Sequence, residues 1–168
     1  MGFSVTVVTP KIIGGEVASS TAIRQALAEG DMEKVTRLLG RPFSLQGKVV
    51  RGEHRGTGLG FPTVNLSVDV KMALPPDGVY ATRTFVGGQE YQAVTNIGRR
   101  PTFGDNNERT IESFILNYNQ DVYGQEVKIE IIQRLREEKS FANKEELKKQ
   151  IAADVKLGTA ILNTQGRE

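Results

Sequence analysis

The chain has 168 residues, with 22 Lys and Arg against 20 Asp and Glu, no cysteine and a single histidine. This length accommodates one domain with a short additional segment, and the lack of cysteine excludes disulfides and thiolate zinc sites. The nearly balanced charge gives no indication of a nucleic-acid or membrane surface. Because no apolar run reaches the roughly 20 residues of a membrane helix, and no signal peptide is recognisable, we expect a soluble, cytoplasmic protein.

The first forty residues predict a small α/β segment. Residues 3–9 are rich in β-branched side chains and predict a strand. Two short helices should follow, each with a capping residue at its start and a glycine at its end. The candidates are the Ser-Ser-Thr run at 19–21 and Asp31 at the starts, and Gly30 and Gly40 at the ends. An Arg-Pro pair then interrupts the pattern, and we place a domain boundary between residues 1–40 and 41–168.

The second part of the chain is dominated by strands. The expected strands are 43–49, 61–68, 79–86, 90–97, 110–116 and 126–135. Gly87-Gly88 indicates a hairpin turn, and the polar stretch 98–109 should be a long mobile loop. A last helix should begin at Asn143 and cover one face or end of the sheet. Six antiparallel strands without βαβ alternation indicate a small barrel or sandwich.

A glycine-rich run at residues 55–65 is the first candidate for chemistry. It holds Gly56, Gly58 and Gly60, and then Thr63 and Asn65, which share one face of a strand. Such a run could hold a phosphate and a magnesium ion, because Mg²⁺ prefers oxygen ligands and leans on substrate phosphates. The alternatives are a tight bend at a barrel corner for the glycines, and turn capping for the Thr and Asn.

Among the acidic residues, Glu112 is the main candidate for a catalytic role. It alternates in phase with Phe114, so an apolar neighbourhood would raise the pKa of its carboxyl and suit a general base. In the alternative interpretation, Glu112 lies on a solvent face while Ile111 and Ile115 fill the core. The strand carries apolar residues on both sides, so periodicity leaves both interpretations open. The charged cluster at 134–139 is typical of solvated surface.

Taken together, the run at 55–65 resembles the signature of the riboflavin kinase family. The resemblance continues, in order, through Gly78–Ala81, Asn96–Phe103, Glu112–Leu116, Tyr123–Gly124 and Leu135–Phe141. The matching motifs lie within residues 43–162. Within residues 1–40, Ser19–Arg24 and the stretch that starts at Gly30 resemble the tail of the FMN adenylyltransferase module of bifunctional bacterial FAD synthetases.

This resemblance implies a mainly β fold: a six-stranded antiparallel barrel of Greek-key type with a C-terminal helix. It implies transfer of the ATP γ-phosphate to the 5′-hydroxyl of riboflavin to give FMN, with Glu112 as the catalytic base. The implied ATP and phosphate contacts are Gly52, Arg55, Gly56, Gly58, Gly60, Thr63 and Asn65. The implied flavin contacts are Pro62, Asn65, Glu112, Arg136 and Phe141. Thr63 and Asn65 would also hold Mg²⁺, the only implied cofactor.

The chain departs from the family pattern at two positions and lacks one motif. Val64 replaces the usual Ala between Thr63 and Asn65, and Thr57 stands where many relatives carry a basic residue. The paired-histidine motif of the adenylyltransferase is missing, so we expect FMN but no FAD, and a separate adenylyltransferase module in the full-length protein. A non-catalytic flavin- or nucleotide-binding barrel is the main alternative. An oligonucleotide-binding barrel fits less well, because the charge is balanced and tryptophan is absent.

Overall fold

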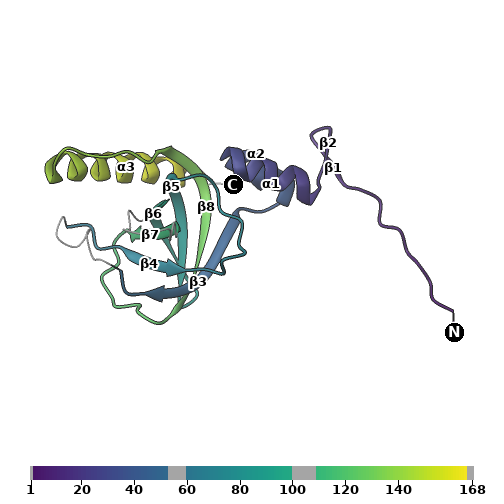
Figure 1. Ribbon diagram of the computed structural model, residues 1–168, viewed down its shortest axis with the longest axis horizontal. Coiled ribbons are helices and arrows are strands. Elements are labelled where there is room, and N and C mark those ends of the chain that lie inside the picture. Colours follow the sequence, from purple (N-terminus) through teal and green to yellow (C-terminus); the bar gives the residue numbers. More distant parts are fainter. Residues whose placement is uncertain (1, 53–59, 100–108, 166–168) are drawn as a thin grey trace.

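The computed structural model describes residues 2–52, 60–99 and 109–165 (Figure 1). Two helices and a short hairpin precede a barrel, and a long helix ends the chain. The elements are β1 (Ile12–Ile13), β2 (Glu16–Val17), α1 (Ser20–Glu29), α2 (Met32–Leu39), β3 (Phe43–Val50), β4 (Val64–Ser67), β5 (Gly78–Val86), β6 (Gln89–Arg99), β7 (Arg109–Ile115), β8 (Glu126–Glu137) and α3 (Lys144–Thr164).

Six strands form a closed antiparallel barrel in the order β3-β4-β7-β6-β5-β8. This confirms the expected mainly β barrel with a C-terminal helix. Closure pairs both edges of the sheet, so the barrel exposes no row of unpaired backbone groups between these strands. Along each strand, side chains alternate between the barrel interior and its outer face.

The barrel interior contains a group of hydroxyl side chains among apolar ones. Thr82, Thr84, Thr95 and Ser113 are fully buried. The hydroxyls of Thr82 and Thr95 lie 2.8 Å apart, and Thr95 Oγ1 donates to Ser113 Oγ at 2.9 Å. These hydrogen bonds offset the cost of burying hydroxyl groups. The alternation that places Ser113 inside directs its neighbour Glu112 to the outer face.

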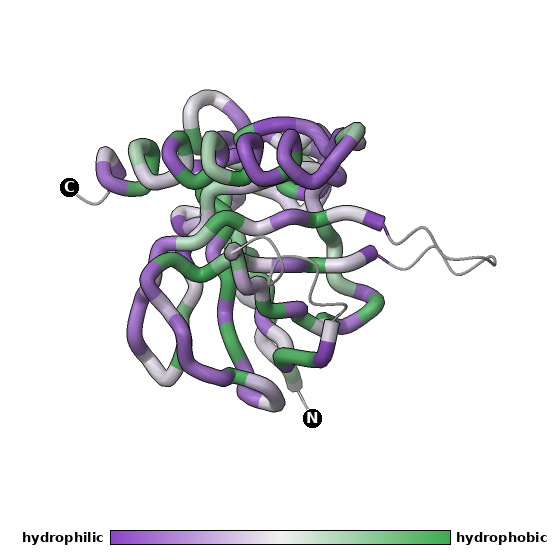
Figure 2. The backbone as a smooth tube through the Cα atoms, turned by 90° about the vertical axis from the view of Figure 1, so that its left-hand side faces the viewer, coloured by the Kyte–Doolittle hydropathy of each residue, from purple (hydrophilic) through white to green (hydrophobic). Residues whose placement is uncertain are grey.

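Helix α3 lies along one side of the barrel (Figure 1), where it contacts β5, β6 and β8. Asn143 caps it as expected, because its side-chain oxygen accepts from the Glu146 amide at 2.9 Å. Gly158 allows close approach, since a Cβ there would lie 3.2 Å from Val94 Cγ2. In Figure 2, α3 is hydrophilic over much of its length, as expected for a helix with one solvent-exposed face.

The two N-terminal helices pack against the barrel. Both begin and end as the sequence predicted, with Ser19 and Asp31 accepting from backbone amides and Gly30 and Gly40 in the left-handed conformation. Met32 and Val35 of α2 belong to the same buried apolar cluster as the barrel interior. In the described ranges, no helix is long and apolar enough to cross a membrane.

Two local predictions were wrong, and one short hairpin was not predicted. Residues 3–9 form no strand: they are exposed and pair with nothing that the structure describes. The short hairpin of β1 and β2 was missed, although Gly14-Gly15 between Ile12-Ile13 and Glu16-Val17 is a hairpin signal. The expected loop at 98–109 is shorter, because 98–99 extend β6 and Arg109 begins β7, while 100–108 lie outside the described residues.

Candidate functional site

The strand register places five residues in one row across the outer face of the barrel. Asn65 of β4 is the cross-strand partner of Glu112 on β7, and Glu112 is also the partner of Asn96 on β6. Asn96 pairs with Val79 of β5, and Val79 pairs with Arg136 of β8. Partner residues of an antiparallel pair point to the same side. Residues that lie far apart in the sequence therefore share one surface, which we call the outer row.

A pocket of about 250 Å³ lies between this row and helix α3, and we call it the helix pocket. Its walls are apolar side chains from the barrel, the segment before β4, α3 and the connection before α3, and a few polar groups converge on it. The apolar side chains are Phe61, Val79, Val94, Phe114, Phe141, Leu147 and Ile151; the polar ones are Thr63, Asn96, Glu112, Arg136, Glu138, Lys139 and Asp154. Such a mixture is typical of a small-molecule site.

Glu112 is half-buried on the outer face beside Phe114, while Ile111, Ser113 and Ile115 point into the barrel. The two interpretations of this strand each hold in part. Glu112 and Phe114 lie on the face away from the core, as the alternative expected. This face lines the helix pocket, however, and is not simply open to solvent. Phe114 also packs edge-on against Phe61, with ring centroids 5.3 Å apart.

A second pocket, of about 360 Å³, adjoins the first at Thr63, and we call it the loop pocket. It is lined by Gly52, Pro62, Thr63 and Asn65, together with residues 118–123 after β7. Thr63 is the residue that lines both pockets. Of the predicted phosphate residues that the structure describes, Gly52, Thr63 and Asn65 line the loop pocket, whereas Gly60 lines neither pocket. The predicted flavin residues are divided: Glu112, Arg136 and Phe141 line the helix pocket, and Pro62 and Asn65 line the loop pocket.

Asn65 is fixed tightly at the start of β4. The residue is 7% exposed, and its side chain lies so close to Gly52 that a Cβ on that glycine would fall 1.9 Å from Asn65 Nδ2. The neighbouring Val64 pairs with Ser113 and packs against the barrel core. Its branched side chain is therefore turned away from the outer face that Asn65 occupies.

Arg136 enters the helix pocket from the end of β8. Its guanidinium donates to both carboxylate oxygens of Asp154 on α3, at 2.8–3.1 Å, and to the Glu137 carbonyl at 2.9 Å. The same guanidinium lies 5.8 Å from the centre of the Phe141 ring, which is within the range of a cation–π contact. The charged cluster at 134–139 is therefore not simply solvated surface.

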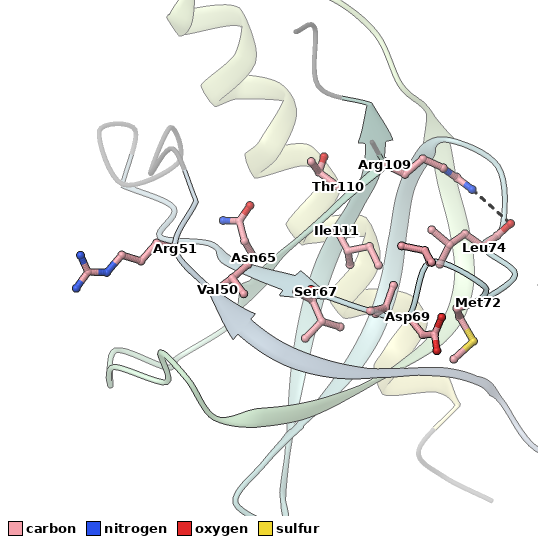
Figure 3. A pocket seen from close by; sticks show the side chains of 13 residues that line it. Val50, Arg51, Asn65, Ser67, Asp69, Met72, Leu74, Arg109, Thr110 and Ile111 are labelled. Carbon is pink, nitrogen blue, oxygen red and sulfur yellow. Dashed lines mark hydrogen bonds between the residues drawn. The ribbon is translucent and has the colours of Figure 1, made fainter. Parts of the chain in front are cut away.

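A larger pocket of about 520 Å³ lies on the far side of Asn65, between β4, β7 and residues 68–74 (Figure 3). Asn65 and Thr110 lie at one end of it, Asp69 and Met72 lie at the other, and Arg51 points away. Arg109 donates to the Leu74 carbonyl at 3.5 Å, which is the dashed line in Figure 3. This pocket contains neither Glu112 nor Thr63, so the predicted chemistry does not gather in it.

Three predicted phosphate residues, Arg55, Gly56 and Gly58, lie outside the described residues, as does Thr57. Gly60 is described and has a left-handed backbone, φ 84°. Asn96 and Asp154 line the helix pocket but were not predicted as site residues. The position of Asn96 in the outer row follows from strand register, which the sequence does not reveal. Asp154 could have been noticed as a charge on the apolar stripe of α3.

The donor set around Thr63 and Asn65 fits magnesium only in part. Both side chains carry a hard oxygen, which Mg²⁺ prefers. Among the residues that the structure describes, no group of three or more acidic or histidine side chains could hold a metal ion by itself. A magnesium ion held here would take its remaining ligands from water and from substrate phosphates, as is usual for this metal.

Comparison with known proteins identifies the family of this chain. The family model for riboflavin kinase matches residues 39–162. A bifunctional riboflavin kinase/FMN adenylyltransferase of Bacillus subtilis is 42% identical over 138 residues, covering 81% of this chain and 44% of the relative. The Escherichia coli protein of the same name is 38% identical over 154 residues, covering 91% and 49%. The chain thus spans about half the length of these relatives.

Solved structures share the fold. A riboflavin kinase from Trypanosoma brucei superposes with a TM-score of 0.52 at 28% identity, covering 73% of this chain and 80% of that one. A chain from Streptococcus pneumoniae described as a macrolide-efflux protein superposes with a TM-score of 0.84 at 35% identity, covering 90% and 50%. The assignment rests on the sequence matches rather than on that description. The chain belongs to the riboflavin kinase family.

Proposed function

We propose that this chain is an ATP-dependent riboflavin kinase, which transfers the γ-phosphate of ATP to the 5′-hydroxyl of riboflavin and releases FMN and ADP. One observation carries the proposal: Thr63 lines both the loop pocket and the helix pocket. The flavin would occupy the helix pocket and reach toward Pro62 and Asn65, which line the adjoining loop pocket. The nucleotide would occupy the loop pocket, so that its phosphates reach the hydroxyl at Thr63.

The two pockets suit these two substrates. The helix pocket offers a largely apolar space with aromatic side chains, which is appropriate for a flat ring system. The loop pocket brings Gly52 together with the side-chain oxygens of Thr63 and Asn65. The remaining phosphate contacts would come from Arg55, Gly56, Gly58 and Gly60. Phosphoryl transfer depends mainly on positioning and charge stabilisation, which such an arrangement can supply.

Glu112 is the proposed base. It lies in the helix pocket and is the cross-strand partner of Asn65. This position supports a role close to where the two substrates would meet. There it would accept the proton of the riboflavin hydroxyl as the oxygen attacks the γ-phosphorus. Magnesium, which we propose is held by Thr63 and Asn65, would neutralise charge on the nucleotide phosphates. Arg136 and Phe141 would form the wall beside the flavin.

We propose that these 168 residues make FMN but not FAD. The paired-histidine motif of the adenylyltransferase does not occur in the sequence, which contains one histidine. In a full-length protein like the relatives, the adenylyltransferase module would be the partner that converts FMN to FAD. Because ATP is the phosphate donor, the cytoplasm is the proposed site of action.

The test is direct. The purified chain is incubated with riboflavin, MgATP and no other enzyme, and the flavins are separated by chromatography. Accumulation of FMN without FAD is the expected result. Riboflavin binding without formation of FMN would contradict the proposed kinase activity and would instead support a non-catalytic flavin-binding barrel. Formation of FAD would contradict the assignment of a single activity to this chain.

A further inference from the structure

We propose that Asp154 of α3 is a positioning residue for the flavin, acting by holding the guanidinium of Arg136 in the helix pocket. The proposal rests on the proposed function, because it concerns the flavin side of the same site. Asp154 is 4% exposed and lies on the face of α3 that packs against the barrel. A buried carboxylate on such a face needs a specific partner, since burying an unpaired charge is costly.

The contact between Asp154 and Arg136 fixes the guanidinium in direction as well as in place. Arg136 Nε lies 3.0 and 3.1 Å from the two carboxylate oxygens, and Nη2 lies 2.8 Å from Oδ2. Nη1 donates in addition to the Glu137 carbonyl at 2.9 Å. Such forked pairing sets the plane of the guanidinium, which a single hydrogen bond would not do.

Gln150 extends this contact along α3. Its Nε2 donates to Asp154 Oδ1 at 2.8 Å, and its Oε1 accepts from Lys139 Nζ at 2.6 Å. Lys139 lies 5.4 Å from the centre of the Phe141 ring, and Arg136 lies 5.8 Å from it. One turn of α3 therefore holds both cations that flank Phe141. The helix therefore positions the wall of the pocket through these polar contacts as well as through its apolar side chains.

Stability alone is a weak reason for this arrangement. A buried ion pair adds little to the free energy of unfolding compared with well-packed apolar side chains of similar volume, because both charges must leave water on folding. At the wall of a binding pocket the pair has another use. A guanidinium with a fixed plane offers a flat surface to a flat ring, and its charge is already balanced by Asp154. This wall suits an uncharged ring system better than a phosphate group.

The substitution that tests the proposal is Asp154→Asn, which keeps the shape and weakens the charge-assisted contact. We expect the Kd and the KM for riboflavin to rise by about tenfold, the change expected when such hydrogen bonds are weakened. The KM for ATP and the kcat should stay within about twofold of the values for the unsubstituted chain. A twofold change is smaller than the change caused by losing one hydrogen bond. Equal changes in both KM values, or a fall in kcat alone, would overturn the proposal.

The matched control is Glu90→Gln. Glu90 is the partner of Arg83 at 3.4 Å, in an ion pair on the hairpin of β5 and β6 that does not line the helix pocket. This variant should leave the Kd for riboflavin unchanged. If Glu90→Gln weakened riboflavin binding as much as Asp154→Asn, the effect would be a general one of lost ion pairs, and the proposal would fail.

A double variant separates positioning from folding. Arg136→Met with Asp154→Leu replaces the pair by apolar side chains, which proteins commonly tolerate without loss of stability. We expect a Tm equal to that of the unsubstituted chain, with riboflavin binding still weakened. Recovery of full riboflavin affinity in this variant would show that the pair serves folding only, and would overturn the proposal.

The Kd for riboflavin, measured by quenching of flavin fluorescence without ATP, keeps this test apart from that of the proposed function. If the unsubstituted chain bound riboflavin but formed no FMN, the proposed kinase activity would be contradicted. The Kd values for riboflavin would still decide the role of Asp154. If FMN formed normally and Asp154→Asn left the Kd unchanged, only the positioning role would fail.

Discussion

At the scale of single residues, Glu112 is notable for its neighbours. On one side its cross-strand partner is Asn65, and on the other side it is Asn96. Two amide side chains beside a carboxylate supply hydrogen-bonding groups without adding charge. Glu112 and Thr63 both line the helix pocket. In the proposed reaction, this places the base beside the residues that hold the phosphates.

The first prediction concerns Glu112→Gln. Glutamine keeps the size of the side chain but does not accept the hydroxyl proton, so we expect kcat to fall by about a hundredfold or more. Riboflavin binding, measured by fluorescence quenching, should persist. Glu126→Gln is the control, because Glu126 is an exposed residue at the start of β8. Unchanged turnover in Glu112→Gln would mean that the residue is not the base.

The second prediction concerns the proposed magnesium ligands. Thr63→Ala and Asn65→Ala each remove one oxygen at the boundary of the loop pocket. We expect weaker ATP binding in the presence of Mg²⁺ and little change without it, as titration calorimetry with and without EDTA would show. An equal loss of affinity under both conditions would argue that these side chains contact the nucleotide and not a metal ion.

The residue scale also shows where sequence reasoning ends. The sequence pointed to Glu112, Arg136 and Phe141, and the structure brings them into one pocket. It did not point to Asp154, because its place in the pocket depends on how α3 sits on the barrel. A helix pattern predicts which face is buried, but not which strand it meets. The roles of all these residues stay predictions.

At the scale of elements, α3 is the element that turns the outer row into a pocket. Its inward stripe contains Leu147, Ile151 and Asp154 at the pocket, and Gly158 and Leu162 further on against the barrel. Ala81, Ile132 and Leu162 form a small apolar cluster separate from the barrel interior. Apolar contacts near the C-terminal end of the helix and the Asp154–Arg136 ion pair near its middle therefore both join α3 to the barrel.

The third prediction concerns Gly158→Val. A Cβ at this position already lies 3.2 Å from Val94 Cγ2 and 3.6 Å from Leu135 Cδ1. Branched methyl groups would push the helix outward, so we expect a loss of about 1–3 kcal/mol in the free energy of unfolding, as for other overpacked sites. Because α3 carries Asp154, the KM for riboflavin should rise while the KM for ATP stays unchanged. Urea unfolding and steady-state kinetics provide the two measurements.

Ala160→Val is the control for this prediction. Ala160 is exposed on the same helix, so valine there introduces the same branched side chain without touching the barrel. Valine lowers the helix propensity at Ala160 and raises it at Gly158, so a larger loss of stability at Gly158 would come from the close approach. If both variants lost the same stability and kept the same KM for riboflavin, the close approach at Gly158 would be irrelevant to the site.

Most elements could be predicted because their signals are local. The helix caps at Ser19, Asp31 and Asn143 and the Gly87-Gly88 turn all depend on neighbouring residues, and the structure contains them. The strand expected at 3–9 failed for the opposite reason. A β-branched run favours an extended backbone, but a strand also needs a partner, and none lies beside it in the described residues.

At the scale of the whole molecule, one end of the barrel is closed by the segment before β5. Asp77 forms ion pairs with Arg99 at 3.1 Å and with Arg109 at 2.7 Å, and its carbonyl accepts from Arg134 at 2.7 Å. The Tyr80 hydroxyl donates to the Pro76 carbonyl at 2.6 Å from a fully buried position. The segment thus joins β5, β6, β7 and β8 at one place.

The fourth prediction follows from Tyr80. Burial raises the pKa of its hydroxyl above the usual value of about 10, although Arg134 and Arg109 nearby act to lower it. A raised pKa in the folded state means that the contribution to stability is complete below pH 10. It is lost as the pH rises through the higher folded value, because the unfolded chain then ionises more readily.

Tyr80→Phe should therefore flatten the fall in unfolding free energy between pH 9 and pH 11, an interval around the ordinary tyrosine pKa of about 10. At pH 8, well below that pKa, it should cost about 1 kcal/mol for the lost hydrogen bond. Tyr123→Phe is the control, since Tyr123 is 55% exposed. Urea unfolding across this range gives the measurement. An alkaline decline as steep in Tyr80→Phe as in the unsubstituted chain would contradict the prediction.

The outer row has a consequence for assembly. Its first members, Asn65 and Val79, precede the tight turn at Gly87-Gly88, and Asn96, Glu112 and Arg136 follow it. The turn joins Val86 to Gln89, at the opposite end of β5 from Val79. If the chain were divided at this turn, neither fragment would hold the row, and complementary fragments would regain flavin binding only by closing the barrel together. Flavin fluorescence would then report the association of the two halves.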